Sequence, residues 1–114
     1  MILRPGEKTH VILRRAFLQD IRRHFIGEVT DATDSIVRAE GNAYLYDTNT
    51  NLFVRKSYSQ VRIFSLADAV NIISVLPRAA NLKKTVYKLT EKNRMVLTYG
   101  ESLSMDVNEF GVNR

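Results

Sequence analysis

The chain has 114 residues and no cysteine, and its 17 lysine and arginine side chains outnumber its 12 aspartate and glutamate side chains, a formal net charge of +5. This length suits one domain, the absence of cysteine excludes disulfides and thiolate metal sites, and no apolar run is long enough to span a bilayer. We therefore expect one domain over residues 1–114, located in the cytoplasm and not associated with a membrane. The excess of basic residues is compatible with an anionic partner.

Alternating apolar and polar residues, many of them β-branched, predict strands along most of the chain. The first two strands are expected at 10–15 and 24–31, joined by a helical turn or a loop at 16–22. Gly27, inside the second strand, predicts a bend, a bulge or a close approach of two backbones. The short polar side chains of 31–35 predict a turn.

A long run at 36–47 predicts the third strand, and the polar residues after it predict a hairpin loop. We expect 43–46 to pair with 52–55, and 36–40 to pair near 60–65. These pairings would make an extended hairpin arm.

The last part of the chain predicts one short strand and then a meander. A helical turn at 66–70 precedes a strand at 71–76, which Pro77 ends, and a connection at 78–84 follows it. The meander strands are expected at 85–90, 95–100 and 103–107. The sequence therefore predicts a mainly β protein with helix confined to short turns.

Two motifs and the order of the strands carry a family resemblance. The segment HFIGEV places Phe25 two positions before Gly27, and DATDSIV places an aspartate turn at Asp34 before the next strand. Together with the strand order over 6–77, these motifs resemble the Sm/LSm-like small β-barrel, of the bacterial or phage type. The resemblance implies a strongly bent, SH3-like barrel core at 6–77, to which the hairpin arm and a β extension at 78–111 are added.

The chain departs from this family at two points. Val37 stands where members that bind uridine-rich RNA in a ring pore carry an asparagine, and residues 65–70 replace their basic–glycine pair. The resemblance therefore does not imply the pore-type RNA site.

The residues that usually carry catalysis or hold metals do not form a recognisable pattern. His10 and His24 are too far apart for a metal-binding motif, and the five glycines are too scattered for a phosphate loop. Asp31 and Asp34 lie in a turn cluster, where aspartate usually caps backbone amides rather than acting as an acid or base. We expect no enzymatic activity, no cofactor and no metal.

The tightest cluster of positive charge surrounds the connection between the first two strands. It consists of Arg14, Arg15, Arg22, Arg23 and His24. The cluster is either a solvated surface or a nucleic-acid-binding patch. Because neighbouring strand residues point to opposite faces, one member of each arginine pair is expected to point inward or along the edge of the sheet, and to pair there with Asp20 or Glu28.

Two functions remain open at this stage. The first is a homo-oligomer that binds RNA or another nucleic acid, with edge strands paired between copies and the basic cluster repeated around the assembly. The second is a protein-interaction or scaffold module that uses the hairpin arm and the meander. The aromatic residues of the arm, Tyr44, Tyr46, Phe53 and Tyr58, favour cross-strand packing, with base stacking as the alternative.

Overall fold

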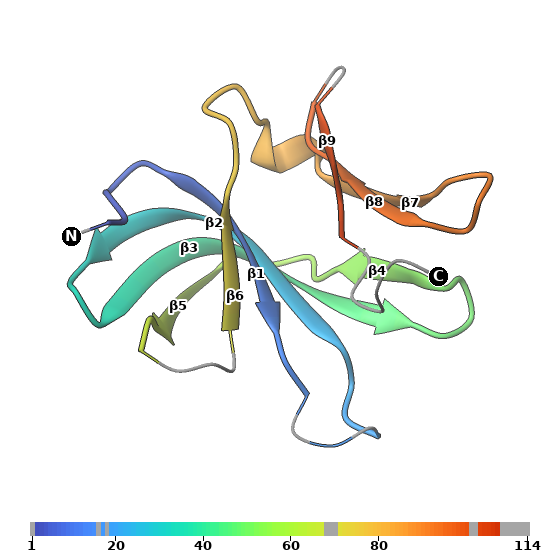
Figure 1. The fold of residues 1–114 in the computed structure, drawn as a ribbon, viewed down its shortest axis with the longest axis horizontal. Coiled ribbons are helices and arrows are strands. Elements are labelled where there is room, and N and C mark those ends of the chain that lie inside the picture. Colours follow the sequence, from blue (N-terminus) through green and yellow to red (C-terminus); the bar gives the residue numbers. More distant parts are fainter. Residues whose placement is uncertain (1, 16, 18, 68–70, 101–102, 108–114) are drawn as a thin grey trace.

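The computed structural model describes the whole chain except residues 1, 16, 18, 68–70, 101–102 and 108–114. The described residues form two antiparallel sheets (Figure 1). The larger sheet contains β1 (Lys8–Leu13), β2 (Arg23–Ala32), β3 (Ile36–Asp47), β4 (Leu52–Arg55), β5 (Gln60–Ser65) and β6 (Asn71–Val75). The smaller sheet contains β7 (Val86–Leu89), β8 (Met95–Thr98) and β9 (Ser104–Asp106), and the 3₁₀ helix η1 (Leu82–Lys84) precedes it. The prediction of a mainly β protein is confirmed.

The larger sheet is open, with the strand order β4-β3-β2-β1-β6 and with β5 as a second partner of β3. Figure 1 shows β4 and β5 at opposite ends of the long, curved β3. β5 pairs only with β3 and β6 only with β1 among the described residues, so the sheet does not close into a barrel. The expectation of a bent sheet is met, but a closed barrel is not formed.

The pairing of the hairpin arm agrees with the prediction to within one residue. Residues 44–47 lie opposite 52–55, and residues 36–41 lie opposite 60–65. The meander is also confirmed, since β7, β8 and β9 pair in sequence order.

The expected helical turns have different outcomes. η1 falls inside the predicted connection 78–84. Residues 68–70 of the turn expected at 66–70, and residues 16 and 18 of the turn expected at 16–22, lie outside the described residues. In the described part of the connection 16–22, the Asp20 amide donates a hydrogen bond to the Phe17 carbonyl at 3.1 Å.

Two glycines allow β2 and β3 to approach closely where the sheet bends. Gly27 and Gly41 lie directly opposite each other. A Cβ atom on Gly41 would collide with the backbone of Ile26 and Gly27, and one on Gly27 would collide with the Glu40 carbonyl. The close approach predicted from Gly27 is therefore present, and it requires a residue without a side chain on both strands.

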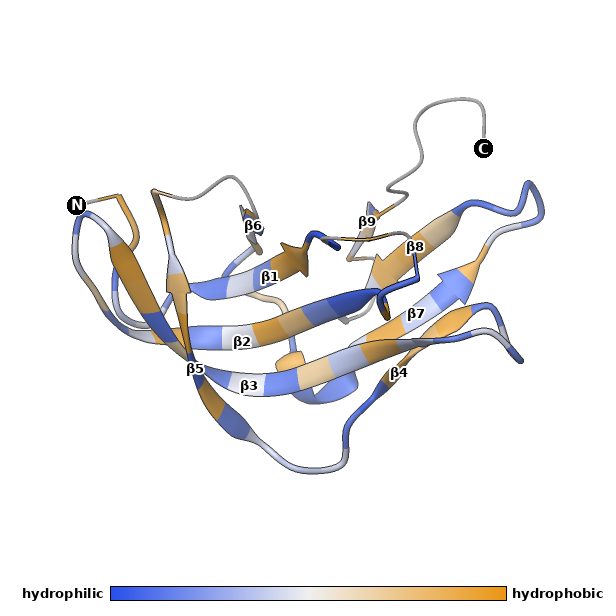
Figure 2. Ribbon diagram, turned by 90° about the horizontal axis from the view of Figure 1, so that it is seen from below, coloured by the Kyte–Doolittle hydropathy of each residue, from blue (hydrophilic) through white to orange (hydrophobic). Residues whose placement is uncertain are grey.

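The larger sheet buries both of its faces. Figure 2 shows hydrophobic and hydrophilic bands along its strands, as expected when successive side chains point to opposite faces. One face covers a first core of Leu3, Val11, Phe25, Val29, Ala32, Val37, Ala39 and Phe64. The other face packs with the smaller sheet around a second core of Ile26, Tyr44, Phe53, Leu76, Ala80, Tyr87, Met95, Leu97, Tyr99 and Val107.

A buried polar cluster joins the two sheets inside the second core. The Tyr87 hydroxyl lies 2.7 Å from His24 Nδ1 and 3.1 Å from His10 Nε2, and those two ring nitrogens lie 3.0 Å apart. His10 and His24 have no exposed surface, and Tyr87 is 2% exposed. Nearby, the Tyr44 hydroxyl bonds to the Thr85 hydroxyl. These polar contacts fix the position of the smaller sheet, because buried polar groups that lose their partners are costly.

Burial and electrostatics act in opposite directions on Tyr44. Burial raises the pKa of the Tyr44 hydroxyl, whereas the Thr85 hydrogen bond and the Arg55 charge act to lower it, and burial dominates.

No helix within the described ranges is long and apolar enough to cross a membrane.

Candidate anion-binding groove

The predicted basic cluster is divided between the two faces of the larger sheet. Arg23 is exposed, whereas Arg22 is only 9% exposed and lies on the face of the second core. The Arg22 guanidinium carbon is 4.7 Å from the centre of the Tyr46 ring and 5.2 Å from that of Phe53, which are cation–π distances. Strand alternation thus points one arginine of this pair inward, as expected, and it stacks on aromatic rings there.

His24 differs from the exposed arginines in its burial. Its side chain is fully buried, its Nδ1 atom bonds to Tyr87, and its ring stacks on Phe53 with 3.9 Å between ring centres. A group placed in this way holds the core together and does not face an external ligand.

The other arginines gather beside a hollow at the end of β1. β1 ends at Leu13, two residues earlier than expected, so Arg14 and Arg15 lie in the connection that follows it. Together with Arg23 and Asp20 they line a hollow of about 280 Å³. The structure therefore brings three of the five predicted residues to this hollow, and His24 lines a neighbouring hollow together with Arg23.

A second hollow, of about 240 Å³, lies beside the first, since Leu13 and Arg23 line both. The second hollow adds Lys56 and Arg62, which come from the far side of β3. We refer to the two hollows together as the basic groove. It is lined by Leu13, Arg14, Arg15, Asp20, Ile21, Arg23, His24, Phe25, Ala43, Leu45, Lys56, Tyr58, Gln60 and Arg62.

The groove combines positive charge with an apolar floor. Five basic residues and one acidic residue, Asp20, line it. The Asp20 carboxylate accepts a hydrogen bond from the Phe17 amide at 3.0 Å, so part of its hydrogen-bonding capacity serves the turn. Leu13, Ala43 and Leu45, which are all partly exposed, contribute the apolar floor, and Phe25 beside them is buried in the first core. Such a surface suits a ligand that carries phosphate groups and flat apolar parts.

Side-chain hydrogen bonds hold the wall of the groove between β4 and β5. The side-chain amide of Asn42 donates to the backbone carbonyls of Lys56 and Tyr58 at 3.0 and 3.1 Å. The backbone amide of Lys56 donates to the Ala43 carbonyl at 2.8 Å. Arg62 donates twice to the Gln60 side-chain oxygen, at 3.1 and 2.7 Å. These bonds orient the Arg62 guanidinium and fix the segment that carries Lys56.

Sequence reasoning did not place Lys56, Tyr58 or Arg62 in this site. They are more than thirty positions from Arg23 in the chain, and only the folding back of the arm brings them together. The predicted pairings of 43–46 with 52–55 and of 36–40 near 60–65 are the signals that could locate them, because they place Lys56 and the start of β5 beside β3.

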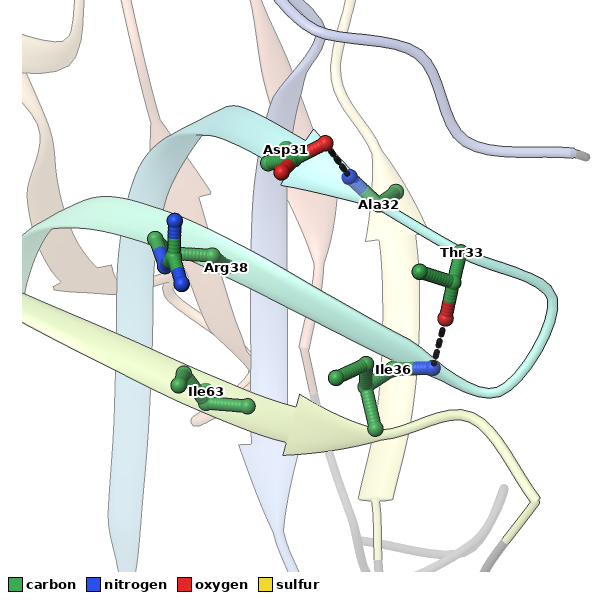
Figure 3. Close-up of a pocket in the computed structure, with 6 residues that line it drawn as sticks. All are labelled: Asp31, Ala32, Thr33, Ile36, Arg38 and Ile63. Atoms are coloured by element: carbon green, nitrogen blue, oxygen red, sulfur yellow. Dashed lines mark hydrogen bonds between the residues drawn. The ribbon is translucent and has the colours of Figure 1, made fainter.

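Two other hollows are weaker candidates. Figure 3 shows the smaller one, at the turn between β2 and β3, where the Asp31 carboxylate accepts from the Ala32 amide and the Thr33 hydroxyl accepts from the Ile36 amide. Its volume is about 40 Å³, well below that of either hollow of the basic groove. Its aspartate caps a backbone amide, as the sequence predicted, and does not face a ligand.

The other hollow, of about 520 Å³, lies beside the start of β1 and the end of β6. Its Lys8 ammonium donates to the carbonyls of Arg78 and Ala80 at 2.8 and 2.5 Å, and so ties β1 to the chain that enters the smaller sheet. This lysine has a structural role, which makes the hollow a poorer anion site than the basic groove.

Across the residues that the structure describes, no group of three or more histidine, cysteine, aspartate or glutamate side chains is placed to hold a metal ion. Comparison of the chain with protein-family models, with curated proteins and with solved structures finds no match.

Proposed function

We propose that the chain binds nucleic acid in the basic groove, as a non-enzymatic protein related to the Sm-like small barrels. The observation that carries this proposal is the convergence of Arg14, Arg15, Arg23, Lys56 and Arg62 around one groove with a single aspartate. An exposed salt bridge contributes only about 0–1 kcal/mol, so stability is a weak reason to gather these cations. A phosphate backbone is a better reason, because guanidinium groups bind phosphate oxygens in pairs.

The strand order supports the Sm-like part of the proposal. The order β6-β1-β2-β3-β5 is the one expected when a bent five-stranded sheet is built from two hairpin connections and a last strand that returns beside the first. Gly27 and Gly41 supply the bend at the position where the family motif was recognised. β4 and the smaller sheet are then additions to this core.

Exposed apolar residues on the outer strands support self-association as part of the same function. Val61 and Ile63 on β5 are both 58% exposed, and Ile72 and Val75 on β6 are 41% and 52% exposed. Outer strands with such side chains tend to acquire partners. We propose that β5 of one copy pairs with β6 of the next in a closed homo-oligomer, which repeats the groove and strengthens weak phosphate contacts.

Charge-matched variants test the groove. Arg23→Gln combined with Lys56→Gln removes two groove cations. Lys88→Gln combined with Lys92→Gln removes two exposed cations, one from β7 and one from the turn between β7 and β8. Both changes lower the net charge by the same amount. Fluorescence anisotropy with a labelled single-stranded oligonucleotide at low salt should show at least tenfold weaker binding for the groove variant and less than twofold for the control.

Equal losses in the two variants would mean that binding follows net charge, and the groove would not be the site. No binding by the unmodified protein at low salt would refute the nucleic-acid role and favour the protein-interaction module. Sedimentation analysis tests the assembly separately, because a mass equal to the 13.1 kDa chain at micromolar concentration would refute the homo-oligomer.

A further inference from the structure

Tyr58 occupies an unusual position for a tyrosine of this protein. The chain has five tyrosines, all within the described residues. Tyr44, Tyr87 and Tyr99 are buried in the second core, and Tyr46 packs against that core. Tyr58 is 56% exposed and lines the basic groove beside Lys56 and Gln60. An exposed aromatic ring in a groove with cations and an apolar floor is well placed for a ligand with a flat face.

The backbone that carries this ring is held in place on both sides. The Asn42 amide donates to the carbonyl of Tyr58 itself and to that of Lys56. Asn42 is fixed in turn by Arg55, which donates to its side-chain oxygen at 3.2 Å. A second donor of Arg55 reaches the Lys83 carbonyl of η1, also at 3.2 Å. The segment is therefore anchored to β3 and, through Arg55, to η1 before any ligand arrives, which lowers the entropy lost on binding.

The charges around Tyr58 lie where the backbone of a stacked nucleotide would run. Lys56 is two residues away, and Arg23 and Arg62 line the same hollow. Arg62 is directed by its two hydrogen bonds to Gln60. A base lying on the Tyr58 ring would bring its sugar and phosphate to the hollow that these three cations line. Bases in a duplex are already stacked on each other and cannot reach such a ring, whereas those of a single strand can.

We propose that Tyr58 is a stacking platform for one unpaired base, and that the basic groove therefore takes single-stranded rather than double-stranded nucleic acid. This inference rests on the proposed function. The aromatic contact supplies affinity without selecting a particular base, because every base has a π-face.

Two variants and three probes test this inference. Tyr58→Ala removes the ring, and Tyr58→Phe keeps it while removing the hydroxyl. The probes are a labelled oligothymidine of twelve nucleotides, an abasic strand with the same number of phosphates, and a duplex of the same length. Because each stacked base contributes about 1–3 kcal/mol by alanine substitution, Tyr58→Ala should weaken oligothymidine binding by about 5- to 150-fold.

Tyr58→Phe should retain oligothymidine binding to within about threefold, because the ring supplies the contact. The abasic strand should bind the parent and Tyr58→Ala equally, because it has phosphates but no base. The duplex should bind the parent more weakly than oligothymidine does. Thermal unfolding of Tyr58→Ala should match the parent, since the ring is exposed.

Several results would overturn the stacking role. One is unchanged oligothymidine binding by Tyr58→Ala, and another is an equal loss on the abasic strand. If either occurs while the Arg23 and Lys56 variant still loses binding, the proposed function stands and only the stacking platform is refuted. If the Arg23 and Lys56 variant also binds as the parent does, both proposals are refuted.

Discussion

The hydroxyl of Tyr87 offers a direct test of how the two sheets are joined. It bonds to His24 Nδ1 at 2.7 Å and to His10 Nε2 at 3.1 Å, and all three residues are buried. Tyr87→Phe removes this hydroxyl and keeps the ring, which packs with Tyr44 and Phe53. The substitution therefore isolates the polar contact from the aromatic packing.

The expected cost of Tyr87→Phe follows from the geometry. Each buried hydrogen bond contributes about 0.5–1.5 kcal/mol, so two bonds would contribute about 1–3 kcal/mol. The two imidazole nitrogens lie 3.0 Å apart and retain each other as partners in the variant, which removes part of the loss. We expect the free energy of unfolding to fall by about 1–2 kcal/mol, which lowers the melting temperature by roughly 4–8 °C for a domain of this size.

Urea unfolding measures this change, and Tyr46→Phe is the matched control. The Tyr46 hydroxyl donates to Asn51 at 3.2 Å at an exposed site, so its loss should change the free energy of unfolding by less than about 0.5 kcal/mol. Hydrogen exchange should show that β7 and β8 lose protection first in Tyr87→Phe. A variant as stable as the parent would refute the role of this hydroxyl in joining the sheets.

Two further predictions concern the fold. Gly41→Ala should lower the free energy of unfolding by at least about 1–3 kcal/mol, because the new Cβ meets the backbone of β2, and an unchanged urea midpoint would contradict the close approach of the strands. The raised pKa of Tyr44 means that its contribution to stability is fully present below pH 10.0, the ordinary value, and is lost as the pH rises through the higher folded value. Stability measured between pH 9 and 11.5 should therefore fall more steeply in the parent than in Tyr44→Phe, and parallel curves would contradict this assignment.

Local sequence patterns were sufficient to predict most strands and their pairing. Alternation fixes which residues of a strand share a face, and the polar loop of the arm sets the register between β3 and β4. Gly27 indicated a close backbone approach because a glycine inside a strand needs a structural reason. Its partner across the strands, Gly41, completes that explanation in the structure.

The site depended on information that sequence patterns do not contain. The adjacent residues Arg22 and Arg23 predict one patch of positive charge. In the structure their side chains lie on opposite faces of the sheet, with Arg22 against the aromatic rings of the second core and Arg23 in the groove. Likewise, nothing local distinguishes the buried His10 and His24 from exposed histidines, because their burial depends on the smaller sheet folding back over β1 and β2. Lys56 and Arg62 join the groove only through the long-range pairing of β3 with β5.

A salt titration of oligonucleotide binding tests the central claim most directly. If the five basic residues of the groove contact phosphates, the logarithm of the association constant should fall linearly with the logarithm of the salt concentration. For a single strand, three to five contacts predict a slope of about −2 to −3.5. A slope in this range that becomes shallower by about 1.4 in the Arg23→Gln and Lys56→Gln variant would support the groove as the binding site. An affinity that does not change with salt, or no binding at low salt, would contradict it.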